Sequence, residues 1–238
     1  MTDPAQITEL SMRLSGHVLF DGLSLNLREN RIGIIGRNGS GKSLLARVLC
    51  GLILPDKGRV LVHGIDVAKD RKQAINTVGI LFQNPDQQII FPMVDEEIAF
   101  GLTQQGHSKS KARAAALAML ARFQASEWAG RSVQTLSQGQ RHLVCLMSVL
   151  AMAPKLIVLD EPFAGLDALT VARLNRILDA VSQQVIHISH DLAALETYDR
   201  VIWLEQGRVA MDGTPAAVIA AYRAEMDRRG QADAVADL

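Results

Sequence analysis

Short apolar runs alternate along the chain with segments in which apolar residues recur at helical spacing. The runs predict strands near residues 7–12, 24–27, 32–35, 59–63, 78–81, 156–159, 185–188, 201–204 and 208–211. Residues 156–159 are apolar at every position, which is typical of a strand buried on both faces of a parallel sheet. The alternation of strands and helices therefore predicts an α/β fold with a mostly parallel central sheet.

Between residues 85 and 154 the pattern becomes helical. Residues 109–124 are rich in alanine with apolar positions at helical spacing, and a second helix is expected from Ser137 to about Met152. We interpret residues 85–154 as a helical subdomain inserted between two parts of an α/β core, residues 1–84 and 155–225. Residues 226–238 lack a clear amphipathic pattern and are expected to form a disordered tail.

The composition narrows the classes of function. The chain has 25 basic and 25 acidic residues, so its neutral charge offers no basic surface and no nucleic-acid partner is expected. The first residues do not resemble a signal peptide, and the apolar run 143–153 is too short to span a bilayer. The chain is therefore expected to be cytosolic and attached to a membrane only through a partner.

The segment after the third predicted strand is a complete phosphate loop of the form G-x-x-x-x-G-K-S. Its glycines allow backbone N–H groups to surround phosphate oxygens, and the following helix adds a partial positive charge. Lys42 is expected to reach the β- and γ-phosphates, and the Ser43 hydroxyl is the expected magnesium ligand. The residues predicted to bind the nucleotide are Gly36, Arg37, Asn38, Gly39, Ser40, Gly41, Lys42, Ser43 and Leu44.

Two carboxylates follow the apolar run at 156–159. Asp160 suits the metal side of a nucleotide site, and Glu161 lies where it could polarise a water that attacks the γ-phosphate. The alternative is a solvated turn ended by Pro162. The phosphate-loop lysine makes the catalytic interpretation the stronger one.

The segment Leu136-Ser137-Gln138-Gly139-Gln140 has two interpretations. Ser137 and Gln140 form an S-x-x-Q capping box, so the segment could simply begin a well-capped helix. Alternatively, the helix N-terminus faces a second anion, with Gly139 permitting a close approach.

Together these motifs resemble those of ATP-binding-cassette (ABC) ATPases, over about residues 5 to 225. The pentapeptide at 136–140 is similar to the LSGGQ signature of that family, with Gln138 in place of a glycine. The other matching motifs are the Q-loop glutamine Gln83, the catalytic glutamate Glu161, the D-loop Ala164-Gly165-Leu166-Asp167 and the switch histidine His190. They lie in the order of the family.

The resemblance implies a P-loop NTPase (RecA-like) core with an N-terminal antiparallel β part and an inserted α-helical subdomain. It implies ATP and Mg²⁺ as cofactors, with Ser43, Gln83 and Asp160 at the metal and Glu161, His190 and Gln83 in catalysis. It also implies a self-dimer in which Ser137, Gly139 and Gln140 contact the γ-phosphate held by the other copy. Identical partners are favoured because both half-sites are chemically complete in this chain.

One feature departs from the family pattern. Many ABC ATPases carry an aromatic residue that stacks on adenine about thirty positions before the lysine, and residues 12–17 contain none. Arg13 or His17 could stack on the base, or apolar contacts could suffice.

The segment after Gln83 resembles the ATPases of energy-coupling-factor (ECF) importers, and is most similar to the biotin-uptake branch, with cobalt or nickel uptake next. The resemblance implies two partners, a transmembrane coupling component and a substrate-binding membrane component. It places the chain as a peripheral protein on the cytoplasmic face of the inner membrane of a prokaryote. In this segment Ile89, Ile90 and Phe91 would contribute apolar contact with the partner. The acids Asp95, Glu96 and Glu97 have two interpretations. They either pair with arginines of the partner or are solvated acids at a helix start.

Two further classes of function are considered. A non-transport ABC ATPase, for example in iron–sulfur assembly or repair, is disfavoured by the neutral charge and the lack of a coiled-coil insertion. An interaction protein with a vestigial nucleotide site is disfavoured because Lys42, Asp160, Glu161 and His190 are all present. An ATPase that energises membrane import is therefore the leading prediction.

Overall fold

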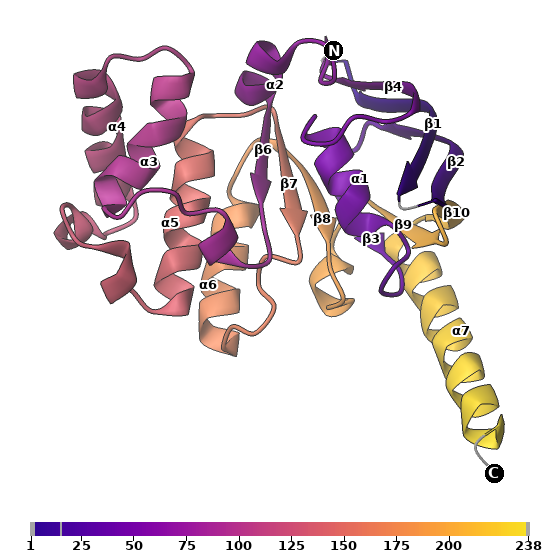
Figure 1. The fold of residues 1–238 in the computed structure, drawn as a ribbon. Helices are drawn as coiled ribbons and strands as arrows, with labels where there is room; N and C mark the ends of the chain where they lie inside the picture. Colours follow the sequence, from indigo (N-terminus) through magenta and orange to yellow (C-terminus); the bar gives the residue numbers. More distant parts are fainter. Residues whose placement is uncertain (1–2, 15, 237–238) are drawn as a thin grey trace.

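The central element of the structure, a computed structural model, is a six-stranded sheet in the order β10-β9-β3-β8-β7-β6 (Figure 1). The structure describes residues 3–14 and 16–236, with only the backbone described for 232–236. The strands are β3 (Arg31–Ile35), β6 (Val78–Leu81), β7 (Leu156–Asp160), β8 (Gln184–Ile188), β9 (Arg200–Glu205) and β10 (Arg208–Gly213). All pairs are parallel except β9 with β10, so the predicted sheet is confirmed.

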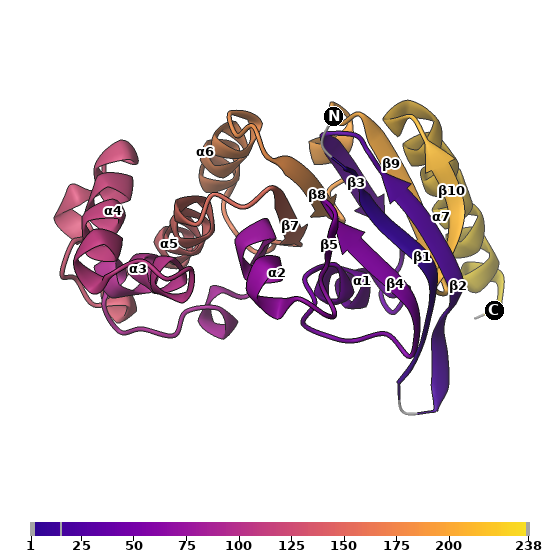
Figure 2. The same cartoon turned by 90° about the horizontal axis from the view of Figure 1, so that it is seen from above.

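A second sheet, antiparallel and four-stranded, lies beside the first in the order β2-β1-β4-β5 (Figure 2). Its strands are β1 (Ala5–Leu14), β2 (His17–Leu27), β4 (Lys57–Val62) and β5 (Ile65–Asp66). Helix α1 (Lys42–Leu49) packs its buried face, including Leu45 and Leu49, into one hydrophobic cluster with apolar residues of both sheets. The phosphate-loop helix is thereby held between the two sheets.

Four helices contribute to a second hydrophobic cluster on the other side of the central strands. They are α3 (Val94–Gln104), α4 (Lys109–Arg122), α5 (Gln138–Ala151) and α6 (Ala168–Asp179). Helix α2 (Arg71–Thr77) instead places Ala74 in the first cluster, and short 3₁₀ helices lie at Pro85–Gln87, Ser126–Trp128, Val133–Thr135 and Ala193–Leu195. Helices α3, α4 and α5 pack together through buried residues such as Ile98, Ala116 and Leu146. In Figures 1 and 2, α5 and α1 lie on opposite sides of β7 and β8.

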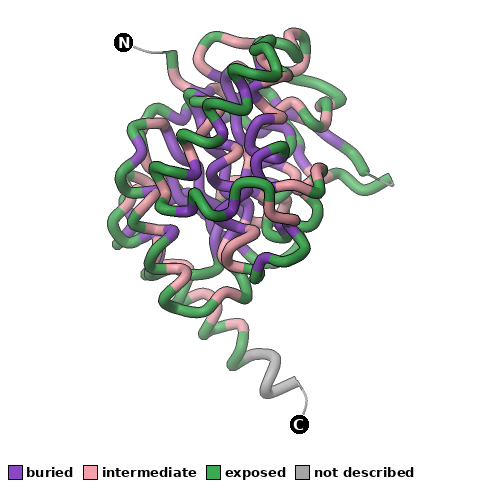
Figure 3. Tube along the Cα trace, turned by 90° about the vertical axis from the view of Figure 1, so that its left-hand side faces the viewer, coloured by how far each residue is buried: buried purple, intermediate pink, exposed green. Residues whose placement is uncertain are grey.

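The chain ends in a long helix, α7 (Pro215–Ala236), which packs on β9 and then extends beyond the body of the molecule (Figure 3). The Tyr222 ring meets Trp203 edge-on, with centroids 5.3 Å apart. Residues 226–236 are helical, so the disordered tail expected there is wrong for this stretch, and 237–238 lie outside the described residues. Its arginines explain the difference: Arg229 Nη1 lies 2.9 Å from Glu205, and Arg228 Nη2 lies 2.7 Å from Glu225.

The carboxyl ends of the parallel strands meet at one edge of the sheet. The phosphate loop follows β3, Asp160 ends β7, and His190 lies two residues beyond β8. In open α/β sheets, ligands bind at this edge. Among the described residues, no helix combines the length and apolarity that a bilayer span requires.

Candidate active site

The phosphate loop depends on glycine at two positions. Gly36 has a φ of 153°, and a Cβ there would lie 2.1 Å from the carbonyl oxygen of Leu204. Gly41 has a φ of 102°, and a Cβ added to it would lie 3.0 Å from the buried Phe20 ring. Larger residues at either position would push the loop away from the sheet, so the glycines set the curvature that a phosphate cradle needs.

The lysine of the loop is folded back against it. Lys42 is 5% exposed, and its Nζ donates to the carbonyl oxygens of Gly36 at 2.7 Å and Arg37 at 2.9 Å. Burial lowers the pKa of Lys42, an effect opposed by the nearby charges of Glu161 and Asp160. Ser40 Oγ is also buried, and among the described residues it has no hydrogen-bond partner. An unpaired buried hydroxyl fits a loop that closes around phosphate oxygens.

Ser43 and Asp160 come together across the site. Ser43 Oγ donates to Asp160 Oδ1 at 2.9 Å, and burial raises the pKa of Asp160. A hydroxyl and a carboxylate are oxygen ligands of the kind that Mg²⁺ prefers, so these residues fit the metal. Gln83 is exposed just beyond β6, where the pairing of Leu81 with Leu159 places it at the same edge.

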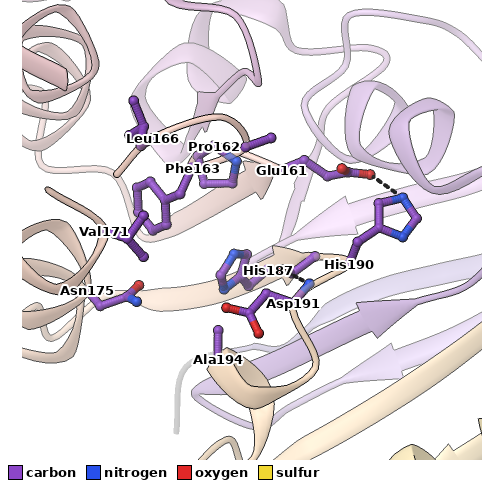
Figure 4. A pocket seen from close by; sticks show the side chains of 12 residues that line it. Glu161, Pro162, Phe163, Leu166, Val171, Asn175, His187, His190, Asp191 and Ala194 are labelled. Carbon is purple, nitrogen blue, oxygen red and sulfur yellow. Dashed lines mark hydrogen bonds and ion pairs between the residues drawn. The ribbon is translucent and has the colours of Figure 1, made fainter. Parts of the chain in front are cut away.

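The second carboxylate, Glu161, contacts His190, the residue expected to be the switch histidine. Glu161 Oε1 lies 2.9 Å from His190 Nε2, as Figure 4 shows. Glu161 has a positive φ of 50°, and its backbone N–H donates to the Ile188 carbonyl at 3.0 Å, so β8 orients this turn. The Glu161 side chain is 19% exposed and that of His190 44%, which leaves both accessible to a ligand. This pair can orient and deprotonate a water.

The signature segment begins α5 with the predicted capping box. Gln140 N–H donates to Ser137 Oγ at 3.3 Å, and Ser137 N–H donates to Gln140 Oε1 at 2.9 Å. Gly139 lies against α6, where an added Cβ would be 2.8 Å from Thr170. The helix prediction is confirmed, but the structure explains the glycine by packing within the chain. The segment is also separated from the chain's own phosphate loop, since α5 and α1 lie on opposite sides of β7 and β8 in Figures 1 and 2.

Two residues near the site were missed by sequence reasoning. Phe20 contacts Gly41, and because β2 does not alternate regularly between buried and exposed positions around it, no period in the sequence marked it as buried. The sequence around His187 indicates only an ordinary core histidine. In the structure it is 2% exposed, with Nδ1 2.9 Å from the Tyr198 hydroxyl, and it faces a pocket of about 280 Å³ behind Glu161 (Figure 4). At the β1–β2 hairpin, Leu14 and Val18 are 57% and 55% exposed, so apolar contact with a base is available there.

His187 should make stability depend on pH. Burial lowers its pKa from 6.5 to about 4, with Asp191 partly opposing the shift, so the unfolded chain takes up a proton that the folded chain excludes. The free energy of unfolding should therefore fall as pH drops from 6.5 towards 4, with a loss of about 2 kcal/mol already at pH 5. Denaturant unfolding at pH 7 and pH 5 should show that His187→Gln removes this loss. His107→Gln, at an exposed position, is the control, and equal pH dependence of the wild type and His187→Gln would contradict the assignment.

Comparison with known proteins agrees with this geometry. Residues 20–164 match the family model described as ABC transporter. The chain is 49% identical to the biotin transport ATP-binding protein BioM of Rhodobacter capsulatus, over 96% of this chain and 97% of that protein. It is 41% identical to the energy-coupling factor transporter ATP-binding protein EcfA1 of Symbiobacterium thermophilum, over 84% of this chain and 72% of the relative. CbiO1 of Clostridium perfringens, part of the ABC transporter complex CbiONQ, has a similar structure, with a TM-score of 0.79 and 29% identity over 92% of each chain. The chain therefore belongs to the ABC transporter family, as one of its ATP-binding, ATP-hydrolysing members.

Proposed function

We propose that this chain is the ATPase subunit of an energy-coupling-factor importer of biotin. The observation that carries the proposal is its near-full-length similarity to a biotin transport ATP-binding protein. The energy-coupling factor relative and the CbiONQ component support the same type of importer. They favour this role over iron–sulfur assembly or repair. In the proposal, residues 1–84 and 155–225 form the core and residues 85–154 the subdomain that responds to the nucleotide.

In the proposed reaction, the phosphate loop and Lys42 hold the triphosphate. Glu161 accepts a proton from the water that attacks the γ-phosphate, and His190, 2.9 Å from this carboxylate, keeps it oriented. Ser43, Asp160 and Gln83 would hold Mg²⁺, which when bound neutralises charge that develops on the phosphate oxygens.

The second half of each site is proposed to come from another copy. The N-terminal turn of α5, with Ser137, Gly139 and Gln140, belongs to a helix that β7 and β8 separate from α1 and the phosphate loop of the same chain (Figures 1 and 2). The partial positive charge of this helix end suits a γ-phosphate held by the partner. ATP would then join two copies in a head-to-tail dimer, and hydrolysis would release them.

A groove between the core and the helical subdomain is the proposed contact with the transmembrane coupling component. This pocket of about 480 Å³ contains Leu52, Ile75 and Ile90, which are 49%, 37% and 67% exposed. An exposed apolar groove of this kind suits an amphipathic helix of a membrane protein. The substrate-binding membrane component would then be reached through that coupling component, with this chain peripheral on the cytoplasmic side.

Two of the three acids expected to meet arginines of the partner are occupied within the chain. Asp95 accepts hydrogen bonds from Arg113 at 3.2 Å and the Gly130 N–H at 3.1 Å. Glu97 Oε2 accepts the N–H groups of residues 90 and 91, each at 2.9 Å. Both acids are 5% exposed, and of the two only Glu97 lines the groove. Glu96 is the exposed acid of the three and stays available to a partner.

Ile90→Asp should separate transport from ATP hydrolysis. A charge in the groove would have to be desolvated on docking, so recovery with the membrane components should fall at least about tenfold. ATP turnover of the isolated chain should stay near that of the wild type. Pull-down from membranes of cells that co-express the components measures the recovery, and phosphate release measures the ATP turnover.

Leu117→Asp is the matched control, because Leu117 is 40% exposed on α4 outside the groove. Uptake of labelled biotin by the same cells, compared with uptake of cobalt, tests the substrate. Recovery of the chain with soluble assembly partners alone would contradict the proposed function, and unimpaired docking of Ile90→Asp would contradict the groove.

A further inference from the structure

Two side chains of α5 tie the signature segment to the loop that carries Gln83. Arg141 Nη1 lies 3.1 Å from Asp86 Oδ1, and His142 Nε2 lies 3.2 Å from the carbonyl oxygen of Gln83. His142 is 1% exposed, so this contact is made away from water. The signature turn and the Gln83 loop are therefore joined directly, although His142 and Gln83 are 59 residues apart in sequence.

The imidazole of His142 lies between two acceptors. Its Nδ1 is 3.0 Å from the carbonyl oxygen of Gln138, and its Nε2 faces the carbonyl oxygen of Gln83. Carbonyl oxygens only accept hydrogen bonds, and a neutral imidazole carries a single N–H. In its neutral form the ring can thus donate to only one of the two carbonyls at a time, and the tautomer decides which one.

The two carbonyls differ in their need for this donor. Gln138 is the first residue of α5, and its carbonyl is the helical acceptor for the backbone N–H four residues later. The tautomer with the hydrogen on Nε2 donates to Gln83 and links two separate segments. The tautomer with the hydrogen on Nδ1 donates to Gln138 and keeps the hydrogen bond within the helix. A shift of the Gln83 loop by bound nucleotide would favour one tautomer over the other.

We propose that His142 is a positioning residue that couples the Gln83 loop to the signature turn. The turn itself is internally fixed, because the capping box joins Ser137 and Gln140 in both directions. The signature turn therefore moves as a unit, and the His142 contact sets the position of this turn relative to the Gln83 loop. The inference rests on the proposed function, in which this turn contacts the nucleotide of a second copy.

Simple packing is the competing explanation for this buried ring. Cys145, one turn further along the same face of α5, also packs on the loop, with Sγ 4.0 Å from the Pro85 carbonyl oxygen. A packing role depends on volume, whereas the proposed role depends on an N–H directed at Gln83. His142→Leu keeps the volume and removes the donor, and His142→Gln keeps an N–H donor on a side chain of similar length.

The experiment uses the full chain and measures three quantities for each variant: ATP affinity, ATP turnover, and ATP-dependent dimer formation in the Glu161→Gln background. His142→Leu should lower kcat and dimer formation about tenfold while changing ATP affinity less than about twofold, because the lost donor acts on the signature turn. His142→Gln should restore both to within about threefold of the wild type. Cys145→Ala, which loses packing and a weak S–H donor to Pro85 but no donor to Gln83, should keep the wild-type kcat.

The outcomes separate the inference from the proposed function. Wild-type kcat and dimer formation in His142→Leu would overturn the inference, as would equal losses in the Leu and Gln variants. A lower melting temperature with proportional losses of ATP affinity and kcat would also assign the ring to packing. If Glu161→Gln alone forms no ATP dimer, the proposed trans site fails, and kcat of the two His142 variants still decides whether the N–H matters.

Discussion

Glu161→Gln is expected to lower ATP turnover by at least about a hundredfold while ATP binding is retained. The substitution keeps the size of the side chain and an oxygen that can face His190, whose Nε2 lies 2.9 Å from the carboxylate. It removes the group that accepts the proton of the attacking water. Because the phosphate loop is untouched, ATP should accumulate between two copies, and the variant should sediment as a dimer with ATP and as a monomer without it.

Phosphate release, nucleotide binding and sedimentation with ATP or ADP test this expectation. Glu196→Gln is the matched control, since Glu196 is exposed and pairs only loosely with Arg223 at 3.5 Å. Near-normal turnover in Glu161→Gln would show that another group activates the water. A monomer in the presence of ATP would show that the nucleotide does not join two copies.

The parts of the fold that could be predicted from sequence are those with a uniform apolar pattern. Strands β6, β7 and β8 were predicted within one residue at each end, because nearly all their positions are buried. Strand β5 was missed because two residues, Ile65 and Asp66, are too few to show a period. Helix α2 was missed because of its seven residues only Ala74 and Thr77 are buried, and its clearest signal is the cap at Asp70.

In the candidate site, positions that follow from strand order could be predicted, whereas contacts between distant segments could not. The parallel-sheet rule predicts that Lys42, Asp160 and His190 gather at one edge, because each follows or ends a parallel strand. No local pattern could predict that Asp95 and Glu97 accept hydrogen bonds from other segments, since those contacts form only on folding. The role of His142 was missed for the same reason, because its partner is the backbone carbonyl of a distant loop.

Lys42→Ala is expected to weaken ATP binding by about tenfold to a hundredfold and to abolish measurable hydrolysis, since charge-assisted contacts to the phosphates are lost. Weaker ATP binding in Lys42→Ala should also arise from contacts that are lost within the chain. Lys42 Nζ also donates to the carbonyl oxygens of Gly36 and Arg37, so its loss would loosen the loop itself. Equilibrium binding of a fluorescent ATP analogue and phosphate release measure the two effects. Lys72→Ala, at an exposed position on α2, should match the wild type.

Mixing Lys42→Ala with a second inactive variant tests whether the signature segment of each nucleotide site comes from the other copy. Ser137→Arg should leave ATP binding intact but block hydrolysis, because a bulky side chain disturbs the capped turn. In a mixed dimer, the intact loop of one copy faces the intact signature of the other. Mixing equal amounts should therefore restore activity at roughly one site in four, because half of the dimers are mixed and each has one complete site. If each chain instead used its own signature segment, neither copy would hold a complete site and the mixture would stay inactive.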